Sequence, residues 1–238
     1  MGVDGCAAGW VGVLRDLRGQ PPRVHVARHF ADLLILRELP SFVAIDIPIG
    51  LPERIGEAGR GPEALLRARL GERQSSVFAI PSRAAVYCDS YEEACRVAAE
   101  TSEPARMVSK QAFFLFPKIR ELDALMQADA GNAYFLHESH PEGAFMTMND
   151  GKPLAEPKKR RGSRHLPGLE LRRDLLTRVA GYERPFLHAD LLHGVGDDDL
   201  LDACACAWTA ERIALGTAVS YPSPPLADAH GIPIAIWT

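Results

Sequence analysis

Four aspartates occupy positions where an apolar strand or helix would bury them: Asp4, Asp46, Asp199 and Asp202. The first two follow strand-like apolar residues at 2–3 and 42–45, and the other two open a mostly apolar helix pattern. An ionised carboxylate is rarely buried unless it is paired or bound to a metal. Two carboxylates about 4 Å apart repel by roughly 4 kcal/mol at an effective dielectric of about 20. If the aspartates converge, the fold therefore requires protonation or a divalent cation.

The composition limits the class of protein. The 238 residues suffice for one domain with a sizeable insertion, and 47% apolar and 24% charged residues are typical of a globular chain. A net charge of −4 means that any polyanion would meet a local basic patch. We expect no membrane partner, because the sequence has neither a long apolar run nor a signal-like N-terminus. Five cysteines without a CxxC pair predict buried thiols in a reducing, cytoplasmic setting.

The first 50 residues alternate between strand and helix patterns. Strands are predicted at 2–5, 9–14, 23–27 and 42–47, with a helix at 30–39 before the last of them. This β-β-β-α-β order carries one aspartate on its first strand and another at the end of its fourth. The pattern predicts an α/β fold in which 42–47 is a central, buried strand.

A helical insertion is predicted over about residues 53–130. Pro62 opens one helix, Ser90 begins a capping box for a second, and Ser109 caps a third that Pro117 kinks or restarts. Beyond the insertion we expect a strand at 134–138, a polar loop at 151–168, helices at 169–180 and 200–215, an extended segment at 217–230 and an edge strand at 234–237.

Six stretches together form a specific pattern: GVDGCAAGWVGV (2–13), AIDIPIGLP (44–52), RARLGERQSSVFAIPSR (67–83), SKQAFFLFPKIRELD (109–123), HESHPEGAF (137–145) and DDLLDACACAWTAER (198–212). In this order the chain resembles a domain-of-unknown-function family described as predicted RNase H-like nucleases. The resemblance implies a single RNase H-like domain over 1–238. Its core would follow β-β-β-α-β-α-β-α around a mixed five-stranded sheet, with the helical insertion. One departure is Ala7, where the family usually has a basic residue.

The resemblance also implies a role for the aspartates. In RNase H-like folds the first and fourth strands are neighbours and the last helix packs over them. Asp4, Asp46 and Asp202, helped by Asp199, would then hold one or two Mg²⁺ or Mn²⁺ ions for catalysis. Taken alone, Asp199 and Asp202 lie three apart on one helix face and fit equally well a pair that complements the helix dipole.

The ESHPE stretch at 138–142 follows the predicted fifth strand. Glu138 is a further candidate metal ligand and catalytic residue, because strand alternation can point it toward the aspartates. His140 is a candidate proton shuttle or orienting donor. The alternative is a turn held by Pro141 with exposed polar side chains, and the roles of His140 and Glu142 stay open.

Candidate substrate-binding residues carry basic or hydroxyl side chains: Arg73, Ser75, Ser76, Lys158 and Arg164. Such groups suit phosphate oxygens, which favours nucleic acid as a partner. The alternatives are a solvated arginine-rich helix face and a solvated basic loop. Lys118 is interpreted as a helix-surface lysine.

We therefore predict a metal-dependent nuclease that hydrolyses phosphodiester bonds at an acidic cluster. Two other functions fit the same fold. One is phosphoryl transfer or nucleotide binding of the actin and sugar-kinase type, which generally needs two such domains. The other is a non-catalytic nucleic-acid- or protein-binding module. The oligomeric state is open, with a homodimer as one option.

Overall fold

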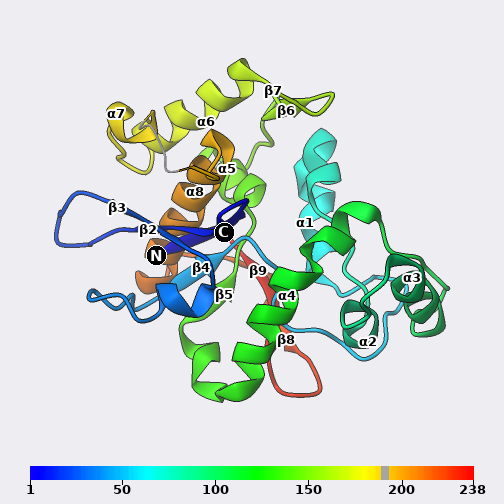
Figure 1. Ribbon diagram of the computed structural model, residues 1–238. Coiled ribbons are helices and arrows are strands. Elements are labelled where there is room, and N and C mark those ends of the chain that lie inside the picture. The colour runs from blue at the N-terminus through cyan, green and yellow to red at the C-terminus, as the bar shows by residue number, and fades with distance from the viewer. Residues whose placement is uncertain (189–192) are drawn as a thin grey trace.

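The computed structural model describes residues 1–188 and 193–238, and its centre is a mixed five-stranded sheet (Figure 1). The strands are β1 (Gly2–Cys6), β2 (Gly9–Leu14), β3 (Arg23–Ala27), β4 (Val43–Ile45) and β5 (Leu136–Glu138). They lie in the order β3-β2-β1-β4-β5. β1, β2 and β3 are antiparallel neighbours, whereas β4 is parallel to both β1 and β5. The predicted α/β class and mixed five-stranded sheet are confirmed.

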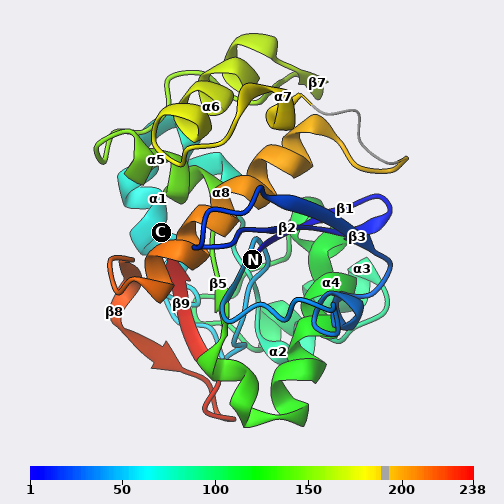
Figure 2. The same ribbon diagram turned by 90° about the vertical axis from the view of Figure 1, so that its left-hand side faces the viewer.

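Helices cover both faces of this sheet (Figure 2). Val3 and Trp10 belong to the core under α4 (Lys110–Ala128), whereas Val11 and Val13 belong to the core under α8 (Asp197–Ala214). This division follows from the strand period of two, which sends successive side chains to opposite faces. Three helices extend the layer of α8: α5 (Pro141–Met148), α6 (Leu166–Arg178) and α7 (Arg184–Leu187).

Helix α8 lies unusually close to β1 because Gly2 has no side chain. A Cβ atom at Gly2 would lie 1.9 Å from the backbone nitrogen of Ala207 and 2.2 Å from the carbonyl oxygen of Ala203. Such distances are far inside van der Waals contact, so only glycine fits. The contact fixes how closely the middle turns of α8 approach the sheet.

The segment between β4 and β5 is largely helical. It contains α1 (Pro62–Leu70), the 3-10 helix η2 (Gly71–Ser76), α2 (Arg83–Val86), α3 (Tyr91–Glu100) and α4, and a short 3-10 helix η3 (Ala130–Tyr134) follows. Ser90 and Ser109 cap α3 and α4, since each hydroxyl oxygen accepts a backbone N–H bond of 3.2 Å three residues later. Helix α4 continues through Pro117 without a break.

The prediction of a helix at 30–39 is wrong, because the structure has a single 3-10 turn there, η1 (Phe30–Leu33). Phe30 and Leu33 are buried, whereas Ile35 and Leu39 are 79% and 71% exposed. A longer helix would bury no continuous apolar face, and burial of such a face is what stabilises most helices in proteins.

Several elements after β5 also differ from expectation. Helix α5 starts directly at Pro141, and the expected loop contains a hairpin of β6 (Lys159–Arg160) and β7 (Ser163–Arg164). At the C-terminal end, β8 (Ser220–Ala227) and β9 (Pro233–Trp237) pair with each other as a separate sheet. The backbone of Trp237 in β9 forms a parallel bridge with Ser139, directly after β5. In the described ranges, no helix combines the length and apolarity that a bilayer crossing needs.

We expect Gly2→Ala to destabilise the protein by about 3 kcal/mol, because the added methyl group must push the backbone of α8 away from β1. Gly12→Ala on β2 is the matched control. Its Cβ would meet only side-chain ends, at 3.1 Å from Met1 and 3.5 Å from Leu33, so its cost should be smaller. Urea denaturation measures both, and a Gly2→Ala midpoint equal to that of wild type would contradict the close contact.

Candidate metal centre

Strand register places Asp4 and Asp46 side by side. Gly2 and Ala44 are partners on the parallel strands β1 and β4, and Asp4 and Asp46 come two residues later on each. The backbone N–H of Asp46 donates to the carbonyl of Val3 at 2.9 Å, which continues the pairing. Residues two apart in a strand share a face, so both aspartates point to the side covered by α8.

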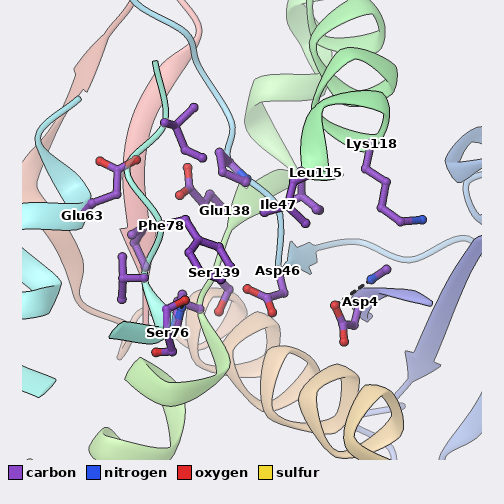
Figure 3. A pocket seen from close by; sticks show the side chains of 16 residues that line it. Asp4, Asp46, Ile47, Glu63, Ser76, Phe78, Leu115, Lys118, Glu138 and Ser139 are labelled. Atoms are coloured by element: carbon purple, nitrogen blue, oxygen red, sulfur yellow. Dashed lines mark hydrogen bonds between the residues drawn. The ribbon is translucent and has the colours of Figure 1, made fainter. Parts of the chain in front are cut away.

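Asp202 of α8 completes an acidic triad, by which we mean Asp4, Asp46 and Asp202. One carboxylate oxygen from each lies within 4.8 Å of the other two. Asp4 and Asp202 are buried, at 8% and 1% exposure, and Asp46 is partly buried. Figure 3 shows the carboxylates of Asp4 and Asp46 on the side of the helix that lies below them. At this separation each pair of ionised carboxylates repels by about 3 kcal/mol. The summed repulsion of the three pairs is therefore comparable to the free energy of unfolding of a whole domain.

A family model described as a protein of unknown function, DUF429, matches residues 2–227. The chain belongs to the DUF429 family. No curated protein and no solved structure matches it.

Lys158 supplies one positive charge to the triad, because its Nζ donates a hydrogen bond to Oδ2 of Asp202. The N–H of Gly5 donates to Oδ1 of Asp4 at 2.7 Å. The other oxygen of Asp202, Oδ1, is buried and has no hydrogen-bond partner among the described residues. One ammonium and one N–H leave most of the negative charge of three carboxylates uncompensated.

Burial and repulsion both favour protonated carboxyl groups in the triad. Burial raises the pKa of Asp4 well above its ordinary value of 3.8, and the nearby carboxylates of Asp46 and Asp199 raise it further. Burial also raises the pKa of Asp46, against the opposing attraction of His140 and Lys158. A bound cation would remove the reason for both shifts.

The triad suits a hard divalent cation. Carboxylate oxygens are the ligands that Mg²⁺ and Mn²⁺ prefer, whereas structural zinc sites use sulfur and nitrogen. The unpartnered Oδ1 of Asp202 is a ligand atom without another use in the described structure. Asp4, Asp46 and Asp202 are thus able to hold such an ion.

The remaining acidic residues of α8 bind elsewhere. Asp199 caps the helix, since its Oδ2 accepts the N–H of Gly196 at 2.9 Å. Its carboxylate is outside the triad but still repels Asp4. Asp198 and Asp197 are paired with Lys159 at 2.6 Å and Arg164 at 2.5 Å. Residues 158–164, which we call the basic hairpin, therefore direct Lys158, Lys159 and Arg164 to three different aspartates of α8.

The structure does not bring Glu138 into the triad. The register pairs Glu138 with Ile45, one residue short of Asp46, so the two acids start from opposite faces of the sheet. Its carboxylate instead accepts bonds from Arg60 at 2.5 Å and from the N–H of Ile49 at 2.8 Å. Burial raises the pKa of Glu138 to about 7, against the lowering influence of Arg60. Arg60, 78 residues away, was not identifiable from the sequence.

Glu142, whose role the sequence left open, also has its own arginine. It opens α5, and one of its oxygens accepts a bond from the fully buried guanidinium of Arg172. The other oxygen is buried without a hydrogen-bond partner in the described part of the chain. Its charge raises the pKa of Asp46, as a minor contribution beside burial. Glu142 is thus near the triad and held by Arg172.

A cavity of about 150 Å³ opens beside the triad, and Asp4 and Asp46 line it. Glu138, Ser76 and His140 line it as well. The Nε2 atom of His140 lies 3.3 Å from the carbonyl oxygen of Ser76, and its Nδ1 is buried without a partner among the described residues. The imidazole is close enough to Asp46 to lower the pKa of that carboxyl group, which puts a proton carrier at the triad.

The other predicted substrate residues lie apart from this cavity. Ser75 is exposed, and Arg73 lies 3.7 Å from Glu72. Lys118, interpreted as a surface lysine, is instead half-buried and lines the cavity. Leu115 and Lys118 are three residues apart on α4 and therefore share one helix face. Their spacing in the sequence does not indicate which part of the protein that face contacts.

We expect manganese to stabilise the protein increasingly as the pH rises. Raised native pKa values mean that the metal-free fold loses stability as the pH rises from about 3.8 through those values. Metal binding requires deprotonated carboxylates, so the gain in Tm with Mn²⁺ should grow from about pH 5 to about pH 8. Thermal denaturation with and without Mn²⁺ checks this, and a gain that does not change with pH would contradict it.

We expect Lys158→Met to cost about 1–2 kcal/mol without metal and to increase the Tm gain with Mn²⁺. The methionine keeps most of the aliphatic stem but removes the charge that Asp202 shares. The cost is below the roughly 3–5 kcal/mol of a broken buried pair, because the lysine side chain is 27% exposed. Lys159→Met, which breaks a pair with Asp198, is the control and should leave the Mn²⁺ response unchanged. A smaller Mn²⁺ response in Lys158→Met would show that Lys158 assists rather than replaces the cation.

Proposed function

We propose that this DUF429 protein is a metal-dependent nuclease that hydrolyses phosphodiester bonds in nucleic acid. The observation that carries the proposal is the acidic triad, in which carboxylates from β1, from the residue after β4 and from α8 converge within 4.8 Å, two of them buried and one partly buried. The sheet order β3-β2-β1-β4-β5, in which only β2 runs opposite to the other four strands, supports an RNase H-like core. In that core the first and fourth strands carry the acids side by side, as β1 and β4 do here.

The cofactor in this proposal is Mg²⁺ or Mn²⁺, held by Asp4, Asp46 and Asp202. When bound, such an ion activates a water molecule and stabilises the charge that develops on the phosphate. The residues of the chain provide the rest. His140, beside Asp46, is placed to accept or return a proton at its unpartnered Nδ1. Lys158 orients the carboxylate of Asp202 and offsets part of its charge through their direct bond.

We also propose that the protein acts in the cytoplasm. All five cysteines are free and buried, which supports a reducing compartment. The nucleic-acid partner is supported by the charge arrangement at the cavity, where a cation from α4 and an acidic metal site lie together.

We expect Asp46→Asn to lower Mn²⁺-dependent cleavage of labelled DNA or RNA by about a thousandfold, which corresponds to roughly 4 kcal/mol of transition-state stabilisation. The substitution removes a ligand charge while it keeps the size of the side chain. Asp198→Asn is the matched control, since it makes the same change on an aspartate that pairs with Lys159 outside the triad. The assay should include single- and double-stranded DNA and RNA. Full metal-dependent cleavage by Asp46→Asn would refute the proposed mechanism.

A further inference from the structure

The cavity beside the triad has a second part with different chemistry. Beyond Asp46, the walls of the cavity are mainly apolar, and we call this part of the cavity the apolar slot. The slot is lined by Ile47, Val77, Phe78, Ile80, Leu115 and Ile236. Figure 3 shows Phe78 and Ser139 on one side of Asp46 and Asp4 on the other. A concave apolar surface with few polar groups is the usual form of a site for a compact ring.

Most polar groups around the slot already have partners. Both oxygens of Glu138 accept bonds, and the hydroxyl of Ser139 donates to the carbonyl of Trp237 at 3.0 Å. Within the described ranges, Nδ1 of His140 and Oε2 of Glu63 remain without a partner. A sugar would leave several hydroxyl groups unpaired there, and each unpaired buried group is costly. A flat ring with one or two polar edge atoms fits the slot better.

The opposite end of the cavity offers a cation beside Asp4. The stem of Lys118 packs over Gly5, where a Cβ atom would lie 2.6 Å from Cε of the lysine. The ammonium group lies over the ring of Trp10 at 4.3 Å from its centroid and donates to the carbonyl of Gly9. An ammonium has three N–H donors, so two remain for an anion. Lys118 is thus a positioned anion-binding group next to the triad.

We propose that this cavity binds one nucleoside 5′-phosphate unit, with the phosphate at Lys118 and the triad and the base in the apolar slot against Phe78. The inference rests on the proposed function for the metal at the triad. At about 150 Å³ the cavity is well below the roughly 300 Å³ of ordinary ligand pockets, so it holds one base and not two. It has one cationic end and one apolar end, whereas a nucleotide inside a strand carries phosphate on both sides. The unit is therefore a free mononucleotide or the last nucleotide of a strand.

Calorimetric titration tests the inference with uridine 5′-monophosphate and ribose 5-phosphate as probes, both in Mn²⁺. We expect the nucleotide to bind at least tenfold more tightly. Phe78→Ala should weaken nucleotide binding by about tenfold, the size of one base–aromatic stack, and leave the sugar phosphate unchanged. Phe114→Ala is the control, because this phenylalanine of α4 is 75% exposed and is not among the residues that line the cavity. Lys118→Met should weaken both probes. Equal affinities for the two probes, or no effect of Phe78→Ala, would overturn the inference.

A second arm separates the two sources of the unit. A linear single-stranded oligonucleotide and its circular form are incubated with the protein and Mn²⁺. If mononucleotides are released from the linear strand and not from the circle, the bound unit is the last nucleotide of a strand. If nucleotide binds but neither strand is degraded, the bound unit is a free mononucleotide. Circles cut as fast as linear strands would overturn the inference while the nuclease proposal stands. Nucleotide that binds equally well with and without Mn²⁺ would overturn the placement of its phosphate at the triad, whereas the metal mechanism itself is tested by cleavage with Asp46→Asn.

Discussion

The main constraint on this structure is the repulsion among three carboxylates that the fold brings together. Backbone pairing fixes Asp4 and Asp46, and the contact between Gly2 and α8 fixes how near Asp202 comes. None of these constraints involves the carboxylates themselves, so the backbone of one acid cannot move away from the others without disturbing a strand pair or a helix contact. The compensation must therefore come from protons or cations. Lys158 provides part of it, and the raised pKa values of Asp4 and Asp46 mark the part that remains.

The buried acidic side chains discussed above fall into two groups that differ in their partners. Glu138 and Glu142 each bind a buried arginine, Arg60 and Arg172 respectively. The pKa of Arg60 is raised because, although burial lowers it, the attraction of Glu138 and Glu63 outweighs that effect. An acid held in this way gives up its partner only at a large cost, since breaking a buried pair is strongly destabilising. Among the described residues, no arginine forms a salt bridge with an acid of the triad. This difference, rather than the number of acids, makes the triad the group of carboxylates that could hold an external ion.

Local patterns in the sequence predict what the backbone decides, and fail where the outcome depends on distant partners. The apolar run before Asp46 and the short strand around Asp4 indicate two central strands, and Ser90 and Ser109 indicate helix starts that the structure confirms. The helix expected at 30–39 does not form, since Ile35 and Leu39 on its apolar pattern stay largely exposed. Similarly, no local sequence pattern indicates that the basic hairpin folds onto the aspartates of α8, or that Arg60 binds Glu138. Opposite charges that pair across dozens of residues leave no periodic signal.

The two ends of the cavity come from different parts of the chain. Asp4 and Asp46 belong to the sheet, whereas Phe78, Leu115 and Lys118 belong to the helical segment between β4 and β5. The acids are fixed by strand pairing and the packing of α8, which tolerate little change. The segment between the strands is tied to the rest through side-chain networks such as Arg83 with Asp123 and Asp228, at 2.9 and 2.6 Å. Replacement of residues in that segment can therefore alter the shape of the slot without moving the acids. In the proposed nuclease, the sheet would then hold the metal ligands, and the inserted helices would select the molecule that binds beside them.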